Sequence, residues 1–186
     1  MNSSAPKEKT AYEKWMELPN NVVGEIIMGD LHVSPRPTPK HGNAASSLLG
    51  EIMGPFHKGK GGPGGWLIMI EPEIHLESNI TVPDIAGWRR ERMPQVPEEA
   101  FFSLAPDWIC EVLSPSTAGL DRAKKMPLYA HQGVKHFWLV DPITKTLEVY
   151  KNDHALWTLV HTYMNNEKVC AVPFDAIEFD LSTLWS

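Results

Sequence analysis

One short segment, residues 107–113 (DWICEVL), constrains the fold of this chain more than any other. It is almost wholly apolar, and such a continuous apolar run bounded by polar loops is typical of a β-strand buried on both faces. Asp107 is its first residue, and Glu111 is the one charged residue in the middle of the run. The segment therefore predicts an interior strand with a carboxylate in its middle.

The rest of the chain alternates between predicted strands and two main helices. Apolar residues alternate with polar ones over 22–35, on both sides of the turn signal Gly29-Asp30, and this pattern predicts a hairpin. Residues 41–56 have apolar side chains at helical spacing, and a second helix is expected over 118–131. Further strands are predicted at 66–76, 80–88, 136–141, 146–151, 156–163 and 168–172. Roughly eight or nine strands and two helices indicate a mixed α/β (α+β) protein.

Length and charge limit the organisation and the class of partner. A chain of 186 residues favours one domain, and we expect an N-terminal extension over 1–20 and a single domain over 21–186. The net charge of −6 excludes attachment to nucleic acid by overall basic charge, although it permits a local basic groove. No apolar run approaches ~18 residues, and the first residues lack the apolar core of a secretory signal. With only two cysteines, a reducing cytoplasm is the expected location.

Two carboxylates occupy positions where an unpaired charge would be costly. An isolated buried Glu111 would cost several kcal/mol or bind a proton, so a metal ion, a lysine or an arginine should neutralise it. Asp84 follows Pro83 within a second apolar segment. Each alone has an ordinary interpretation, a core ion pair for Glu111 and a turn residue for Asp84. Two carboxylates on neighbouring strands, with water filling the remaining positions, suit Mg²⁺ or Mn²⁺.

Four further residues are candidates for such a site. Lys124 and Lys125 open the predicted helix after the Glu111 strand, where an ammonium group could stabilise developing charge. Glu25 near the start of the first strand and His41 at the start of the first helix are candidate ligands or proton-transfer groups. Each of the four could equally be an ordinary surface or capping residue.

An ordered set of motifs includes Gly24-Glu25, Pro83-Asp84, EVLSPST at 111–117 and FWLVDP at 137–142. Over residues 20–184 this set resembles the bacterial restriction-endonuclease-like family, formerly a domain of unknown function, within the PD-(D/E)xK nuclease superfamily. The classical signature has lysine two positions after the glutamate, where this chain has Leu113, and Lys125 is the best match instead. Pro127 should distort the helix that carries it. The matching residues are Gly24-Glu25, Pro37, Pro39, His41, Pro83-Asp84, the run 111–117 (EVLSPST), Asp121, Lys125, Tyr129, Gly133-Val134, the run 137–142 (FWLVDP) and the closing FDLSTLW.

The resemblance implies a fold, a cofactor and a substrate. The fold would be a restriction-endonuclease-like core, a mixed sheet of four to five strands flanked by helices. The activity would be Mg²⁺- or Mn²⁺-dependent hydrolysis of DNA, with Asp84 and Glu111 holding the metal and a helix lysine, Lys125, supporting the attacking water. Glu25 and His41 would complete the catalytic site. A homodimer is plausible, because cutting two strands commonly uses two sites.

Basic residues near the Asp84 strand are candidates for contacts with the DNA backbone. We expect these phosphate contacts from Arg89, Arg90, Arg92 and Lys124.

Two other classes of function stay open at this stage. The chain could be a catalytically inactive assembly module that keeps the nuclease fold, with Glu111 paired to a lysine. Convergence of Lys125 and both carboxylates in one cleft with room for a metal would distinguish an enzyme from such a module. A serine hydrolase using Ser114 or Ser116 is a third possibility, but no GxSxG nucleophile elbow is present.

Overall fold

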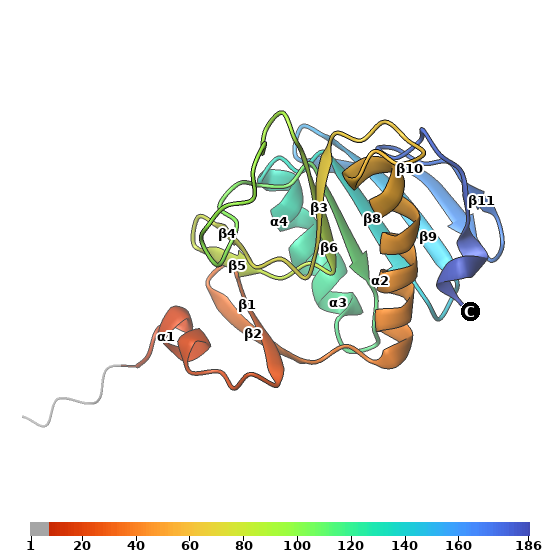
Figure 1. Ribbon diagram of the computed structural model, residues 1–186. Coiled ribbons are helices and arrows are strands. Elements are labelled where there is room, and N and C mark those ends of the chain that lie inside the picture. The colour runs from red at the N-terminus through yellow and green to blue at the C-terminus, as the bar shows by residue number, and fades with distance from the viewer. Residues whose placement is uncertain (1–7) are drawn as a thin grey trace, which may run out of the picture.

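A six-stranded sheet forms the centre of the computed structural model, which describes residues 8–186 (Figure 1). Its strand order is β10-β9-β8-β7-β6-β3, and only β7 and β8 pair in parallel; all other neighbours are antiparallel. The strands span Trp66–Ile70 (β3), Ile85–Arg89 (β6), Trp108–Val112 (β7), His136–Asp141 (β8), Thr146–Asp153 (β9) and Leu156–Met164 (β10). Every residue of β7 is buried, as its continuous apolar sequence predicts.

Two smaller sheets complete the strands. The four-stranded sheet has the order β2-β1-β5-β4, and the two-stranded sheet joins β11 to β12. The predicted hairpin is present as β1 and β2, but its turn lies at Met28 and Gly29, which have φ of 54° and 87°, one residue earlier than expected. The strands span Val22–Ile27 (β1), Asp30–Pro35 (β2), Ile74–Leu76 (β4), Asn79–Thr81 (β5), Lys168–Val169 (β11) and Phe179–Asp180 (β12).

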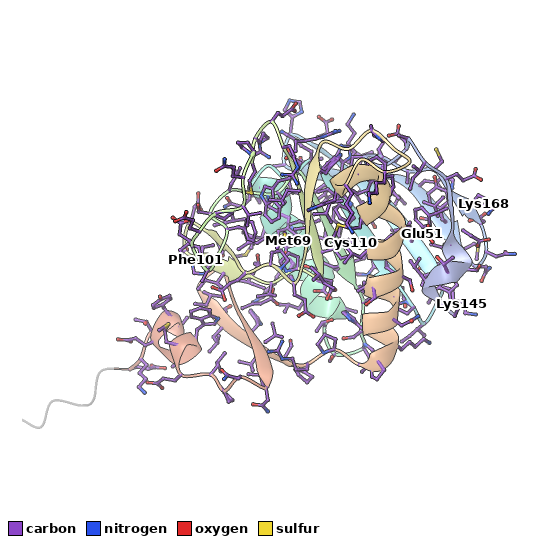
Figure 2. All side chains as sticks on the ribbon, in the orientation of Figure 1. Glu51, Met69, Phe101, Cys110, Lys145 and Lys168 are labelled. Atoms are coloured by element: carbon purple, nitrogen blue, oxygen red, sulfur yellow. The ribbon has the colours of Figure 1, made fainter. Side chains whose placement is uncertain are left out.

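Helices cover both faces of the six-stranded sheet. Helix α2 (Pro39–Ile52) packs on the face that bears Cys110, and Figure 2 shows this side chain in the interior beside α2. Helices α3 (Ala118–Leu120) and α4 (Met126–His131) lie on the other side, where Tyr129 packs with Ile109 (Figure 1). Glu111 is two residues from Ile109, so strand alternation turns its side chain toward α4.

Both main helices contain a π-helical segment close to a proline. η2 (Asp121–Lys125) joins α3 to α4 ahead of Pro127, and the Met126 N–H donates to the Asp121 carbonyl five residues back. η1 (Met53–His57) continues α2 and contains Pro55. Proline donates no backbone hydrogen bond and clashes with the carbonyl four residues earlier, so a widened turn accommodates it. The distortion expected from Pro127 is thus present as a π-helical segment.

Two predicted strands are each divided in two, which corrects the sequence interpretation. Residues 66–76 form β3 and β4, which belong to different sheets, because Glu71 adopts a φ of 44° and Pro72 follows it. Residues 80–88 form β5 and β6, which are separated around Pro83. Asp84 therefore immediately precedes a strand and does not lie within one.

The expected fold class is confirmed, although the details differ. The structure is a mixed α+β arrangement with a mixed sheet and flanking helices, but residues 8–186 contain twelve strands, and the central sheet has six. Short strands such as β12 carry too little periodicity to be predicted. Helix α1 (Ala11–Met16) precedes β1. Within residues 8–186, none of the helices has the length and apolar character needed to cross a bilayer.

Candidate active site

Asp84 and Glu111 meet where β6 begins and β7 ends. The antiparallel register pairs Ile85 with Cys110, so the next residues outward, Asp84 and Glu111, are neighbours. The Val112 N–H donates to Asp84 Oδ2 at 2.7 Å, and the Asp84 N–H lies 3.4 Å from Glu111 Oε2. The backbone at the end of β7 thus holds the Asp84 carboxylate, and the backbone at the start of β6 contacts the Glu111 carboxylate.

Lys125 is the cation that neutralises Glu111. Its Nζ lies 2.7 Å from Glu111 Oε1, 3.0 Å from Glu25 Oε1 and 3.7 Å from Asp121 Oδ1, and its side chain is 4% exposed. Burial disfavours the ammonium, but the charges of Glu111 and Glu25 outweigh that effect and raise the pKa of Lys125 well above its usual value. Lys125 is therefore protonated at neutral pH.

The carboxylates around Lys125 are held by the surrounding backbone and side chains. Glu25 Oε1 also accepts from the Val82 N–H at 2.8 Å, and the Tyr129 hydroxyl donates to Glu111 Oε1 at 2.9 Å. Burial raises the pKa of Glu111 well above its usual value and that of Asp121 less strongly, although the Lys125 charge opposes both shifts. The site therefore carries more acidic groups than its one lysine can neutralise.

His41 approaches the carboxylates from the first turn of α2. Thr38 caps this helix, and its side chain accepts from the His41 N–H at 3.4 Å. The His41 Nε2 lies 3.2 Å from Asp84 Oδ2, whereas the buried Nδ1 has no hydrogen-bond partner in the described structure. Burial lowers the pKa of His41, but the hydrogen bond and charge of Asp84 outweigh it, so the net shift is upward. The ring can therefore exchange a proton beside Asp84.

These side chains line one pocket of about 220 Å³. Its walls come from the β1–β2 hairpin, the start of α2, the β5–β6 connection, the loop after β7, and η2. The carboxylates lie deep in it, because the side chain of Glu111 is 3% exposed and that of Asp84 is 15% exposed. The predicted catalytic residues that line the pocket are Glu25, His41, Asp84, Glu111 and Lys125.

The donor chemistry of the pocket fits a hard divalent cation. Asp84 Oδ2 and Glu111 Oε1 are engaged by protein donors, whereas Asp84 Oδ1 accepts no hydrogen bond from residues 8–186 and Glu111 Oε2 accepts only the long one from Asp84. No group of three acidic, histidine or cysteine side chains among those residues forms a ready metal cage. Mg²⁺ commonly uses only one or two carboxylates and completes its shell with water and substrate phosphates.

The arginines that were predicted to contact the DNA backbone lie outside this pocket. Arg89 is at the opposite end of β6 from Asp84, with its guanidinium over the Trp66 ring. Arg92 pairs with Asp107 at 2.8 Å, and Arg90 donates to a carbonyl in its own loop. The structure does not bring the three arginines to the carboxylates, because β6 separates them by its full length.

Lys124 also points away from the pocket, to Asp30 at 3.0 Å. The structure therefore distinguishes the two adjacent lysines, since only Lys125 lines the pocket.

The sequence interpretation gave no role to Asp121 or Tyr129, although both belong to the matching motifs. Asp121, Lys125 and Tyr129 are spaced four residues apart, which places side chains on one face of a helix. This four-residue spacing is the sequence feature that could have placed Asp121 and Tyr129 beside Lys125. Leu113, at the position of the signature lysine, is buried in the core beside Tyr129.

The serine-hydrolase alternative finds no support in this geometry. The Ser114 hydroxyl lies 2.9 Å from the hydroxyls of Ser116 and Thr117. Among residues 8–186, neither serine is hydrogen-bonded to a histidine ring, which a nucleophilic serine would need as its base.

The structure is a mixed sheet between helices, with acidic residues and a lysine at one end of its central strands. A crystal structure from Anabaena variabilis ATCC 29413, titled a putative nuclease belonging to DUF820, is similar, with a TM-score of 0.75 and 23% sequence identity. The alignment covers 96% of this chain and 98% of that one. The chain belongs to the Uma2 family, described as putative restriction endonuclease, whose profile matches residues 10–182. The comparison with curated proteins found no match.

Proposed function

We propose that this protein is a Mg²⁺- or Mn²⁺-dependent endonuclease that hydrolyses phosphodiester bonds in DNA. The observation that carries the proposal is the convergence of Asp84, Glu111 and Lys125 in one pocket with room for a cation and a phosphate. Membership of the family and the similarity of fold agree with this class of reaction.

Asp84 would hold the metal ion through Oδ1, and Glu111 through Oε2, which accepts only the long bond from the Asp84 N–H. A bound divalent ion lowers the pKa of its water and offsets the charge of the phosphate. The backbone bonds from Val112 and Asp84 keep the two carboxylates oriented before any ligand arrives. Such preorganisation reduces the cost of arranging these groups during the reaction.

Lys125 and His41 would supply the charge and proton functions of the site. Lys125 is held in position by Glu25 and Glu111, so its ammonium is a fixed positive charge beside the reacting phosphate. His41 is positioned by Asp84 Oδ2 to accept a proton from the attacking water or to return one to the leaving oxygen. Glu25 acts here by positioning Lys125.

Cleavage of labelled DNA by the purified protein with Mg²⁺ or Mn²⁺ tests the proposal. Asp84→Asn should lower the rate by about 100-fold or more, because charge stabilisation of this kind contributes several kcal/mol. Asp30→Asn is the matched control, since Asp30 is an exposed aspartate bound to Lys124 outside the pocket, and it should retain wild-type activity. Equal activity of the two variants would remove Asp84 from the mechanism, and an inactive wild type would contradict the proposal.

One observation favours an inactive binding or assembly module as a second candidate. The Lys125–Glu111 pair is already satisfied within the protein, and three carboxylates surround the one ammonium. Such a pair could be purely structural. In that case the wild type would neither bind Mn²⁺ by calorimetry nor cut DNA.

A further inference from the structure

The proposed metal-binding carboxylates are recessed below the protein surface. Glu111 and Asp84 are both mostly buried, and the pocket that leads to them is enclosed by the β1–β2 hairpin on one side and by the loop after β7 on the other. A phosphate reaches them only by entering this recess. The phosphates of a regular duplex lie on a wide convex surface, whereas a phosphate of an unpaired strand can project into such a recess.

Part of the wall of the recess is apolar, and neither a phosphate nor a sugar needs an apolar surface for binding. Five apolar residues contribute to it besides Val112, which meets it through its backbone N–H, and the three prolines among them are exposed: Val23, Pro35, Pro37, Val82 and Pro115. An apolar cavity of about 150 Å³ binds benzene, so a pocket of about 220 Å³ offers space for a larger flat ring. In duplex DNA the faces of the bases are stacked within the helix. A base meets these walls only when it is unpaired.

Polar groups occur along the rim of the same pocket. The hydroxyls of Ser114, Ser116 and Thr117 form a cluster with 2.9 Å spacings, and Arg36 lies on the hairpin side. Hydroxyl and guanidinium donors are typical partners of backbone phosphates. The rim therefore offers phosphate contacts next to a wall suited to a base.

The recess also continues on one side. A second, smaller hollow shares Thr38, His41, Ser114 and Pro115 with the main pocket and extends to Lys40 and Ile143. Lys40 thus places a positive charge at a hollow next to the main pocket, where it can meet a neighbouring phosphate of the same strand. Proteins that bind single strands commonly combine such positive charges with surfaces that contact the faces of the bases.

We propose that the pocket receives an unpaired nucleotide, so that the substrate is single-stranded DNA or an unpaired stretch within a duplex. This inference rests on the proposed nuclease function for its cleavage step. Its binding step, however, depends only on the shape and lining of the pocket, and it can be measured without catalysis.

Binding is measured by fluorescence anisotropy at fixed ionic strength, with Ca²⁺ in place of Mg²⁺, so that an oxygen-binding cation still offsets the carboxylates while cleavage is avoided. The probes are a labelled oligonucleotide of about 16 nucleotides, its perfect duplex, and the same duplex with a central unpaired bubble. We expect the single strand and the bubble to bind at least about ten-fold more tightly than the perfect duplex, since contact with one base contributes about 1–3 kcal/mol. Equal or tighter binding of the duplex, or no binding of any probe, overturns the inference.

Two valines of the hairpin provide a matched pair of variants. Val23→Glu places a charge on the apolar wall and should abolish the preference for unpaired DNA, whereas Val33→Glu changes an exposed valine outside the pocket and should preserve it. Pro37→Glu, at an exposed pocket residue, repeats the test where folding is not at risk. Retention of the preference in both pocket variants overturns the inference.

Cleavage of the same three probes with Mg²⁺ or Mn²⁺ separates this inference from the proposed function. Duplex cleavage as fast as single-strand cleavage would overturn the inference and leave the nuclease function intact. Preferential binding of unpaired DNA without cleavage of any probe would support the inference and contradict the nuclease function.

Discussion

Adjacent lysines with the same sequence neighbourhood occupy opposite environments. Lys124 has a 37% exposed side chain and pairs with the more exposed Asp30, whereas Lys125 is buried against Glu25 and Glu111. An exposed pair is weak because water screens it and because both side chains lose freedom. A buried charge is different, since removing its partner leaves an uncompensated charge in the interior.

Replacing each lysine in turn should therefore have unequal effects on stability. We expect Lys125→Met to lower the free energy of unfolding by about 3–5 kcal/mol, because Glu25 and Glu111 lose their shared countercharge. Lys124→Met should change it by about 0–1 kcal/mol. Urea denaturation at neutral pH measures both. Similar losses in the two variants would show that the buried pair contributes no more than the exposed one.

At the scale of elements, β6 is closely packed against tryptophans of the neighbouring strands β3 and β7. Gly87 in β6 lies between two buried tryptophans, and a Cβ at this position would be 3.2 Å from the Trp66 ring and 3.3 Å from the Trp108 ring. Larger side chains would push β6 away from these rings. Helix α2 contains a different kind of glycine, since nothing within 4 Å would meet a Cβ at Gly50.

Alanine at these two glycines should shift stability in opposite directions. Gly87→Ala should destabilise the protein by about 1–3 kcal/mol through overpacking of the two rings. Gly50→Ala should stabilise it by about 0.5–1 kcal/mol, because alanine is a better helix former in an uncrowded helical position. Thermal denaturation followed by circular dichroism measures both changes. A stable Gly87→Ala variant would mean that the tryptophans can move without cost.

At the scale of the whole molecule, the acidic pocket is where we propose that a divalent cation binds. The chain has a net charge of −6, and within the pocket Glu25, Glu111 and Asp121 surround Lys125 while Asp84 lies beside His41. A ligand that binds the folded state and not the unfolded chain stabilises the whole fold. The unfolding midpoint therefore reports occupancy of this pocket without any measurement of activity.

Addition of Mg²⁺ or Mn²⁺ should raise the unfolding temperature of the wild type. At a concentration of about 100 times the dissociation constant, the expected gain is about 2.7 kcal/mol. The metal-dependent rise in unfolding temperature should vanish in Asp84→Asn. It should persist in Asp30→Asn, which keeps the pocket intact. Differential scanning calorimetry with and without the metal gives these increments. Equal increments in the two variants would place the cation elsewhere.

Local sequence determined several features that the structure bears out. The apolar run 107–113 specified a buried strand, because a continuous apolar segment has no solvent face. The polar residue within it required a countercharge, and Lys125 provides one. Membership of the expected family, carried by motifs spread over most of the chain, is confirmed. These features depend on residues close in sequence or on an ordered set of motifs.

Tertiary structure alone decided which groups meet. Lys125 is fourteen residues from Glu111, and the π-helical segment before Pro127 sets which side of the helix turns inward, so sequence spacing could not choose between Lys124 and Lys125. Positive φ at Glu71 directed the predicted strand 66–76 into two different sheets. The arginines likewise lie beyond the site because β6 begins only after Asp84, which puts Asp84 and Arg89 at opposite ends of the strand. Long-range pairing and helix rotation depend on packing between distant segments, and local patterns contain little of that information.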